Sequence, residues 1–349
     1  MNWRKMGHKK INVAIITGGD SLEASSSIDS AQSIFAHLNS KIFNRYMLKV
    51  ESWHWSLMRA DETDQVDPSN SKLDLSNFSL RIKRKTIRFD VAFIAIHGTP
   101  GETGHLQAYL EMMRIPYIGS GVLASAICMD KFCCKTLIQC LTNAQAPRGK
   151  LLELEKINNQ KLQEAIPFRL PCIVKPNSYG SGVGVTLVNN SETLTEAVKR
   201  VCELGQDVLL EEYIDGREVT VGAIMINDQI QILPLAETLR ENQAHLLQQA
   251  NTYSYTNRQS ATVIIDPPID AELMIQLKNV TIEIGKVIKC RSFFRVDYII
   301  TKDNLVYFLE INTIPGMTDR SVFVKQMEHA GIDRQCFYHR LITETIAAA

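Results

Sequence analysis

Two kinds of hydrophobic pattern follow one another along the first third of the chain. Residues 11–17 and 91–96 are mostly apolar runs that end at glycine or at His-Gly, which is typical of buried parallel strands. Residues 25–39 and 106–114 carry apolar side chains at helical spacing. The alternation of strands and helices predicts an α/β domain built on a parallel sheet.

After about residue 120 the pattern changes to short strands and longer helices. This change of pattern predicts that a new domain begins near 120–125. Two segments are polar: residues 61–88, before this boundary, predict a variable loop or short hairpin, and residues 240–262, after it, predict a polar loop. Strands are expected over 115–118, 171–176, 183–188, 208–213, 219–226, 230–236, 293–300 and 306–311, and helices over 124–141, 192–204, 270–289, around 325–330 and near the C-terminus.

Composition narrows the class of protein further. The 349 residues are enough for two or three domains, and 38 basic residues balance 38 acidic ones. This balance argues against a general nucleic-acid binder and against a polybasic membrane-surface protein. The eight cysteines form no CxxC pair, and no apolar run is long enough to span a membrane. We therefore expect a cytoplasmic, multi-domain α/β protein.

A glycine-rich segment follows a lysine on an expected strand. After Lys175, residues 176–184 hold three glycines and two serines, whose backbone N–H groups can converge on an anion. The spacing matches neither the Walker motif nor the dinucleotide fingerprint. The segment predicts a phosphate-binding loop, and an ordinary glycine-rich hairpin stays open as the alternative.

Two further segments carry charges that suit a nucleotide. Lys131 stands at the start of an expected helix, where a second phosphate ligand or a solvated surface lysine would fit equally. Residues 209–218 form a strand followed by an acidic turn, and such carboxylates can accept hydrogen bonds from adenine and ribose. An exposed acidic loop remains the other interpretation.

Two apolar strands near the C-terminus each contain an acidic residue. Arg295 and Asp297 share one face of the first strand, and Glu310 and Asn312 share one face of the second. An unpaired carboxylate in such a strand is costly. If the strands pair, their oxygen atoms would form a set suited to Mg²⁺ carrying nucleotide phosphates. A buried ion pair with arginine and no metal is the alternative.

These segments together resemble the ATP-grasp superfamily and, within it, the D-alanine–D-alanine ligases. The likeness runs in order from about residue 11 to 335. It includes two substrate motifs of the first domain, GGDSLEASSS at 18–27 and HGTPGETG at 97–104, followed by IPYIGSG at 115–121 and SAICMDK at 125–131. The resemblance implies an α/β ATP-grasp fold in three domains, 1–120, 121–210 and 211–349. The last two would sandwich ATP.

The resemblance also implies an activity and residue roles. The expected reaction joins two D-alanines through an acyl phosphate for peptidoglycan synthesis, with ATP, two Mg²⁺ ions (Mn²⁺ as an alternative) and D-alanine as the small-molecule partners, in a homodimer. The implied roles are nucleotide binding by Lys131, Lys175, Glu211 and Glu218, metal binding by Asp297, Glu310 and Asn312, substrate binding by Glu23, His97, Arg258 and Ser321, oxyanion stabilisation by Arg295 and the Gly316 N–H, and loop closure by Ser181.

The chain departs from the family pattern in three places. The phosphate loop has Tyr179 and Gly182 where the family usually has glutamate and serine, and Thr103 replaces an aspartate. In the second loop, Arg258 and Gln259 stand where a lysine and a tyrosine are usual, and an arginine fork is not equivalent to an ammonium. Other acceptors (D-serine, D-lactate or another amino acid) and a non-catalytic ATP-binding protein therefore stay open.

Overall fold

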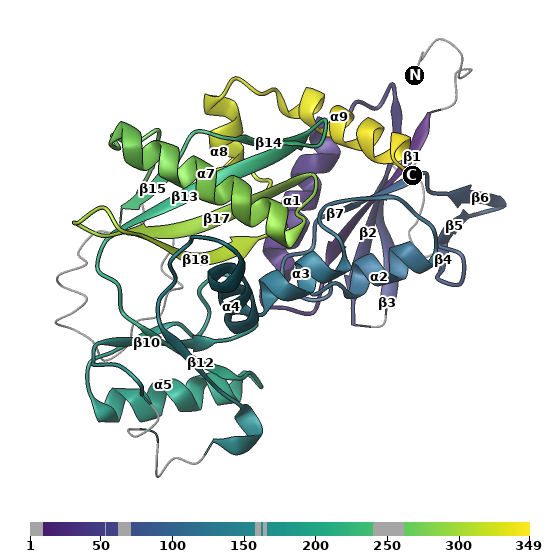
Figure 1. The fold of residues 1–349 in the computed structure, drawn as a ribbon. Coiled ribbons are helices and arrows are strands. Elements are labelled where there is room, and N and C mark those ends of the chain that lie inside the picture. The colour runs from purple at the N-terminus through teal and green to yellow at the C-terminus, as the bar shows by residue number, and fades with distance from the viewer. Residues whose placement is uncertain (1–9, 53, 62–70, 158–161, 163–165, 240–261) are drawn as a thin grey trace. The chain divides into compact units, whose positions relative to one another are not determined.

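The chain folds into two compact units in the computed structural model, which describes residues 10–52, 54–61, 71–157, 162, 166–239 and 262–349 (Figure 1). One unit joins Met1–Val122 to Ile314–Ala349, and the other is Leu123–Thr313. The expected division into three domains stays a prediction. No described helix is long and apolar enough to cross a bilayer.

The first unit is built on the expected parallel sheet. Its strand order is β3-β2-β1-β7-β8; β1 pairs in parallel with β2 and β7, and β7 with β8, while β3 is antiparallel to β2. Residues Val13 to Ile16 are fully buried because helices cover both faces of such a sheet. The strands are β1 (Ile11–Gly18), β2 (Phe43–Glu51), β3 (His54–Ala60), β7 (Val91–Ile94) and β8 (Tyr117–Ile118).

Helices and a small meander complete this unit. Where the sequence predicted a loop or short hairpin, residues 71–88 form three antiparallel strands whose Leu80 and Ile87 join the core. The strands are β4 (Ser71–Asp74), β5 (Ser79–Ile82) and β6 (Lys85–Arg88), and the helices are α1 (Ala24–His37), α2 (His105–Met112), α8 (Val322–His329) and α9 (Arg334–Ala347).

The second unit contains a small antiparallel sheet of order β11-β10-β12-β9, with one helix packed on it. The helix is strongly amphipathic, and its Leu194, Val198 and Val201 are buried against the strands. The elements are β9 (Gly149–Leu152), the short helix η3 (Leu154–Lys156), β10 (Cys172–Pro176), β11 (Thr186–Val188), α5 (Ser191–Glu203) and β12 (Val208–Glu212).

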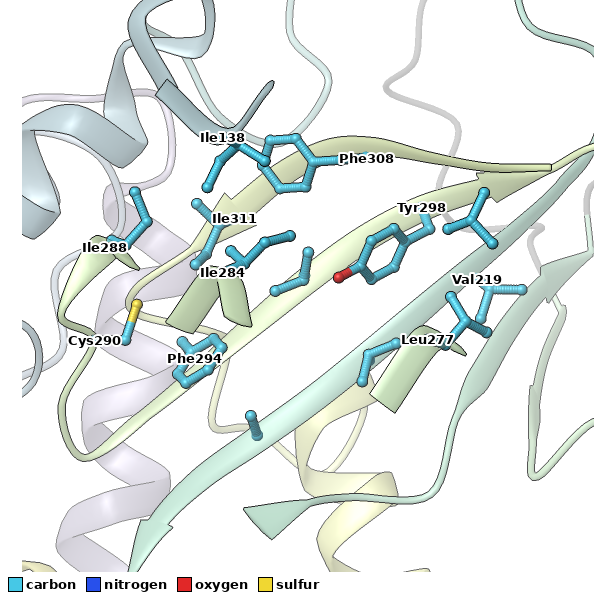
Figure 2. Packing of buried hydrophobic residues seen from close by; sticks show 14 of the residues in the cluster. Ile138, Val219, Leu277, Ile284, Ile288, Cys290, Phe294, Tyr298, Phe308 and Ile311 are labelled. Carbon is cyan, nitrogen blue, oxygen red and sulfur yellow. The ribbon is translucent and has the colours of Figure 1, made fainter. Parts of the chain in front are cut away.

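A larger antiparallel sheet forms the rest of this unit. Its order is β16-β15-β13-β17-β18, with β14 paired to β13. One face packs against α4 and α7, and Figure 2 shows Phe294, Tyr298 and Phe308 among the side chains of that core. The elements are α3 (Val122–Met129), α4 (Lys131–Leu141), β13 (Arg217–Ile226), β14 (Gln229–Ile232), β15 (Ala236–Leu239), β16 (Thr262–Ile265), α7 (Ala271–Ile288), β17 (Phe293–Ile300) and β18 (Val306–Asn312).

Two predicted elements are each divided in two in the structure. The single helix expected over 124–141 is two helices, because Asp130 leaves the helical conformation and its carboxylate accepts the Cys133 N–H at 2.8 Å as an N-cap. The single strand expected over 230–236 is also two strands, β14 and β15. Pro234 lies between them and has no N–H to donate to a sheet.

Candidate active site

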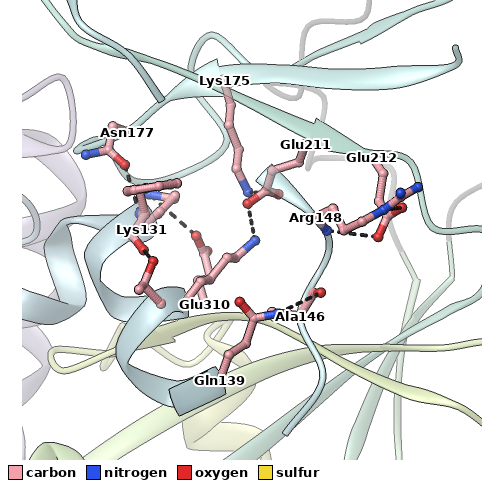
Figure 3. A network of polar contacts seen from close by, with 12 residues as sticks. Lys131, Gln139, Ala146, Arg148, Lys175, Asn177, Glu211, Glu212 and Glu310 are labelled. Carbon is pink, nitrogen blue, oxygen red and sulfur yellow. Dashed lines mark hydrogen bonds and ion pairs between the residues drawn. The ribbon is translucent and has the colours of Figure 1, made fainter. Parts of the chain in front are cut away.

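Lys131 lies at the first position of α4, immediately after its capping aspartate. Its ammonium is 3.6 Å from the Glu310 carboxylate and donates to the Tyr179 carbonyl of the glycine loop (Figure 3). The Phe132 N–H donates to Asn177 Oδ1 at 2.9 Å, which ties the start of α4 to the same loop. Lys131 is only 9% exposed, so it is not the solvated lysine of the alternative interpretation.

Lys175 and Glu211 lie on neighbouring strands of the small sheet. Ile173 is directly opposite Glu211, so Lys175, two residues further along β10, shares its face. The Lys175 ammonium is 2.6 Å from Glu211 Oε2, and both side chains are buried. The lysine that precedes the glycine loop is thus part of a buried ion pair.

Lys135 is a third lysine of this cluster, and the sequence analysis missed it. Its ammonium pairs with Glu211 Oε1, while Lys175 holds Oε2. Burial, together with repulsion from Lys175, lowers the pKa of Lys135 to about 7 despite the attraction of Glu211. For Glu211, burial alone would raise the pKa, but the two lysines outweigh it and hold the pKa below its ordinary value. The available signal was spacing: Lys135 follows Lys131 by one helical turn.

The expected pairing of the two acidic strands is confirmed. Asp297 is directly opposite Glu310, and Arg295 is opposite Asn312. The register shifts between Asp297 and Tyr298, because Tyr298 pairs with Phe308 and leaves Leu309 as an extra residue. This β-bulge keeps Phe308 in the core and turns Glu310 and Asn312 to the face that carries Asp297.

Asp297 is held in place by two side chains. Thr220 Oγ1 donates to its Oδ1 at 2.7 Å, and Arg295 Nη2 donates to its Oδ2 at 2.8 Å. These bonds fix the carboxylate, and each oxygen keeps further lone pairs that can accept. The Arg295–Asp297 ion pair of the alternative interpretation is present. The same arrangement of side chains can therefore contain this ion pair and also bind a metal ion.

The donor set of these strands fits Mg²⁺. Among the described residues, no three His, Cys, Asp or Glu side chains are grouped to hold a metal ion by themselves. Two carboxylates and an amide are hard oxygen ligands, and Mg²⁺ is commonly bound through one or two carboxylates together with substrate phosphates and water. The strands offer only three such ligands, from Asp297, Glu310 and Asn312. A bound nucleotide and water would have to supply the remaining ligands of the metal.

The first unit holds a second polar group, around His97. Its backbone N–H donates to Ser27 Oγ at 2.9 Å, and its Nε2 lies 3.0 Å from Ser30 Oγ. Ser30 Oγ also accepts the Met317 N–H at 3.2 Å. Residues far apart in the sequence therefore converge on one buried serine of α1.

Glu23 and the segment after β18 belong to the same unit. Glu23 is the N-cap residue of α1, and a Cβ atom built on Gly98 would lie 3.6 Å from its Oε2. A Cβ built on Gly316 would lie 2.7 Å from Ser321 Oγ, so only glycine allows this approach without a shift. Ser321 Oγ also accepts the Thr318 N–H at 3.1 Å, which closes this turn.

Comparison with family models shows which protein family this chain belongs to. The model described as D-ala D-ala ligase N-terminus matches residues 12–120, and the model described as D-ala D-ala ligase C-terminus matches residues 145–343. The chain belongs to the D-alanine–D-alanine ligase family. The resemblance stated from the sequence is thereby confirmed.

Individual relatives agree with this assignment in sequence, and solved structures agree with it in fold. A D-alanine–D-alanine ligase of Bacteroides fragilis is 34% identical over 93% of this chain and 96% of that protein. The structure of D-alanyl-alanine synthetase A from Vibrio cholerae has a TM-score of 0.83 at 24% identity, covering 97% of this chain and 99% of that one. A D-alanine–D-alanine ligase from Bacillus anthracis complexed with ATP has a TM-score of 0.73 at 26% identity, covering 97% and 98%. The expected ATP-grasp fold is confirmed.

The remaining residues implied by the ligase resemblance are less tightly grouped. Glu218 lies on β13 opposite Ile299 and is half-buried. Ser181 lies in the glycine loop with a φ of 52°, a left-handed conformation that non-glycine residues adopt rarely. Arg258 lies outside the described residues.

Ser30→Ala should raise the KM for D-alanine about tenfold in this ligase. Each buried hydrogen bond removed costs about 1 kcal/mol or more, and both His97 and the segment of Gly316 depend on this hydroxyl. Steady-state kinetics should show an unchanged KM for ATP, because the residues expected to bind the nucleotide, Lys131, Lys175 and Glu211, belong to the other unit. Ser33→Ala is the control, since its hydroxyl lies 3.5 Å from Arg334 Nη1, at the limit of hydrogen bonding. Equal effects of the two variants would contradict the role given to Ser30.

Proposed function

We propose that the protein joins two D-alanines to D-alanyl-D-alanine at the expense of ATP, with release of ADP and phosphate, for peptidoglycan synthesis. The family assignment over both units supports the reaction, and the ATP complex of the Bacillus anthracis relative supports the nucleotide. The relatives that share a third of their residues with this chain carry the same ligase name, which does not favour another acceptor.

The first step must make a carboxylate reactive. An oxygen of the first D-alanine carboxylate attacks the γ-phosphorus of ATP, and ADP leaves, so that an acyl phosphate forms. Such a transfer depends on positioning and on neutralising the phosphate charge. Lys131 and Lys175 supply cations for this purpose, while Glu211 and Glu218 bind adenine and ribose.

The paired strands β17 and β18 supply the oxygen ligands. Asp297, Glu310 and Asn312 would hold the two Mg²⁺ ions, with Mn²⁺ as an alternative, and the fixed position of Asp297 supports this role. When bound, the metal neutralises phosphate charge. Arg295 holds Asp297 through Nη2, and the Arg295 guanidinium has further N–H donors for the oxyanion.

In the second step, the amine of the second D-alanine attacks the acyl carbon, and phosphate leaves. Arg295 and the Gly316 N–H stabilise the tetrahedral oxyanion. The roles at the substrates follow the resemblance: Glu23 binds the ammonium of the first D-alanine, His97 lies beside that substrate, Ser321 and Arg258 hold the second, and Ser181 closes over the site to exclude water.

The observation that carries the proposal is the arrangement of Asp297 opposite Glu310, with Lys131 beside Glu310. The purified protein should release phosphate from Mg-ATP only when D-alanine is added, and mass spectrometry should detect the dipeptide. D-serine, D-lactate and L-amino acids complete the panel of acceptors. If a mixed product forms and no D-alanyl-D-alanine is detected, the acceptor is a different molecule. If the rate of phosphate release does not depend on D-alanine, the proposal is contradicted.

The oligomeric state and the cellular location are proposed on weaker grounds than the reaction. The homodimer is proposed on the family resemblance alone, and light scattering of the purified protein tests it. A cytoplasmic location is proposed because ATP is the substrate, and cell fractionation tests that.

A further inference from the structure

Lys135 is a buried charged residue for which the reaction above has no role. Its side chain is 6% exposed, and that of its partner Glu211 is 3% exposed. It lies on α4, whereas Glu211 and Lys175 lie on β12 and β10 of the small sheet. The three side chains therefore connect the helix to the sheet through one carboxylate. Figure 3 labels Lys175 and Glu211 of this group.

The arrangement places a single carboxylate between two ammonium groups. Each oxygen of Glu211 faces a different lysine, so these three side chains carry one more positive than negative charge when both lysines are protonated. Burying an ammonium is unfavourable unless it is paired, and a lone Lys175–Glu211 pair would already be neutral. The second lysine thus has a cost in stability that its packing does not explain.

The nucleotide role of Lys175 gives a reason for that cost. A lysine that binds phosphate gives up part of its interaction with its carboxylate partner. Glu211 would then be a buried charge without compensation, which is strongly unfavourable. Lys135 prevents this, because its ion pair with the other oxygen does not depend on where the Lys175 ammonium points.

We propose that Lys135 is a positioning residue for nucleotide binding: it keeps Glu211 paired and oriented, so that Lys175 is free to contact nucleotide phosphates. This inference rests on the proposed function, which assigns Lys175 to phosphate and Glu211 to adenine. In this role Lys135 acts through Glu211 and not by contact with the substrates or the reacting atoms.

Electrostatics on the described elements agrees with this assignment. The charges that act on Lys135 are Glu211 from β12, Lys175 from β10 and Glu310 from β18. Repulsion from Lys175 contributes to the lowered pKa of Lys135. Anionic phosphates drawn to Lys175 relieve that repulsion, so nucleotide binding and the charge of Lys135 support each other.

The test compares nucleotide binding by variants of the full chain. Lys135→Met keeps most of the length of the side chain and removes the charge. Calorimetry with Mg-ADP should show a Kd at least tenfold higher than that of the unmodified protein, and Lys135→Arg should recover part of the loss. In kinetics, the KM for ATP should rise by a similar factor while the KM for D-alanine changes less than twofold. Lys199→Met, at an exposed Lys–Glu pair of α5, is the matched control and should change neither value.

A double-mutant comparison separates positioning from packing. If Lys135 acts through Glu211, adding Lys135→Met to Glu211→Gln should weaken Mg-ADP binding less than twofold further. A role in packing alone would lower the melting temperature of Lys135→Met and leave the Kd of the folded protein unchanged, which would overturn the inference. If the protein carrying Lys175→Met still binds Mg-ADP normally, the proposed nucleotide site itself is wrong. If only Lys175→Met loses binding, that site stands and the role of Lys135 fails.

Discussion

Glu310→Gln should lower kcat about 10³-fold, because the substitution removes one of two carboxylate charges from the proposed metal site. A bound metal contributes several kcal/mol to stabilising the charge that develops in phosphoryl transfer, and about 4 kcal/mol corresponds to 10³ in rate. The amide has the same shape as the carboxylate, and the Glu310 side chain is 32% exposed, so the fold should survive. ADP release at saturating ATP and D-alanine measures the effect, and a titration with Mg²⁺ should show a higher concentration for half-maximal rate.

The control for Glu310→Gln is Glu203→Gln, which removes an exposed glutamate paired with Lys199 on α5. Exposed pairs of this kind contribute little, so kcat should stay within twofold. A Glu310 variant with unchanged kcat and unchanged Mg²⁺ dependence would exclude this residue as a metal ligand. It would leave Glu310 with a structural role, such as its ion pair with Lys131.

The acidic strands show how far sequence reasoning reaches. Alternation by two predicted that Arg295 and Asp297 share one face of their strand and that Glu310 and Asn312 share one face of theirs. In the structure the two strands pair, with Asp297 opposite Glu310 and Arg295 opposite Asn312. The bulge at Leu309 was not visible in the pattern, since a strand of constant alternation would put Phe308 and Glu310 on the same face. Residue types therefore indicated the chemistry of the site, while a local irregularity of the backbone decides its geometry.

Lys135 and Ser30 mark the limit of what the sequence could predict. A lysine in an amphipathic helix is usually interpreted as a solvent-exposed residue, and a serine next to apolar residues gives no indication of a function. Their importance depends on partners far away in the chain: Glu211 for Lys135, and His97 and Met317 for Ser30. Only the packing of helices on their sheets brings these partners together. The break at Asp130 could have been found locally, because aspartate is a strong N-cap residue.

Arg295→Lys is expected to lower kcat about 10²-fold with little change in the KM for ATP. Lysine keeps the positive charge beside Asp297, which accepts from Arg295 Nη2 at 2.8 Å, but it lacks the planar fork that can hold Asp297 and a second acceptor together. If the second acceptor is the tetrahedral oxyanion, the lost interaction exists only in the transition state. Removal of one such donor typically costs 10²–10³ in kcat. Kinetics with both substrates varied separates this effect from weaker ground-state binding.

The same substitution at Arg217 provides the comparison. Arg217 lies on β13 of the same sheet and donates through Nε and Nη2 to both oxygens of Glu237 at 2.8 Å, so Arg217→Lys breaks a forked ion pair. Its loss should cost stability, as measured by denaturant unfolding, and leave kcat within threefold. The contrast between the two variants isolates catalysis from packing, because both lose one guanidinium fork and both keep the charge. A raised KM for ATP with normal kcat in Arg295→Lys would assign Arg295 to nucleotide binding, and the oxyanion would then have to be stabilised by backbone N–H groups such as that of Gly316.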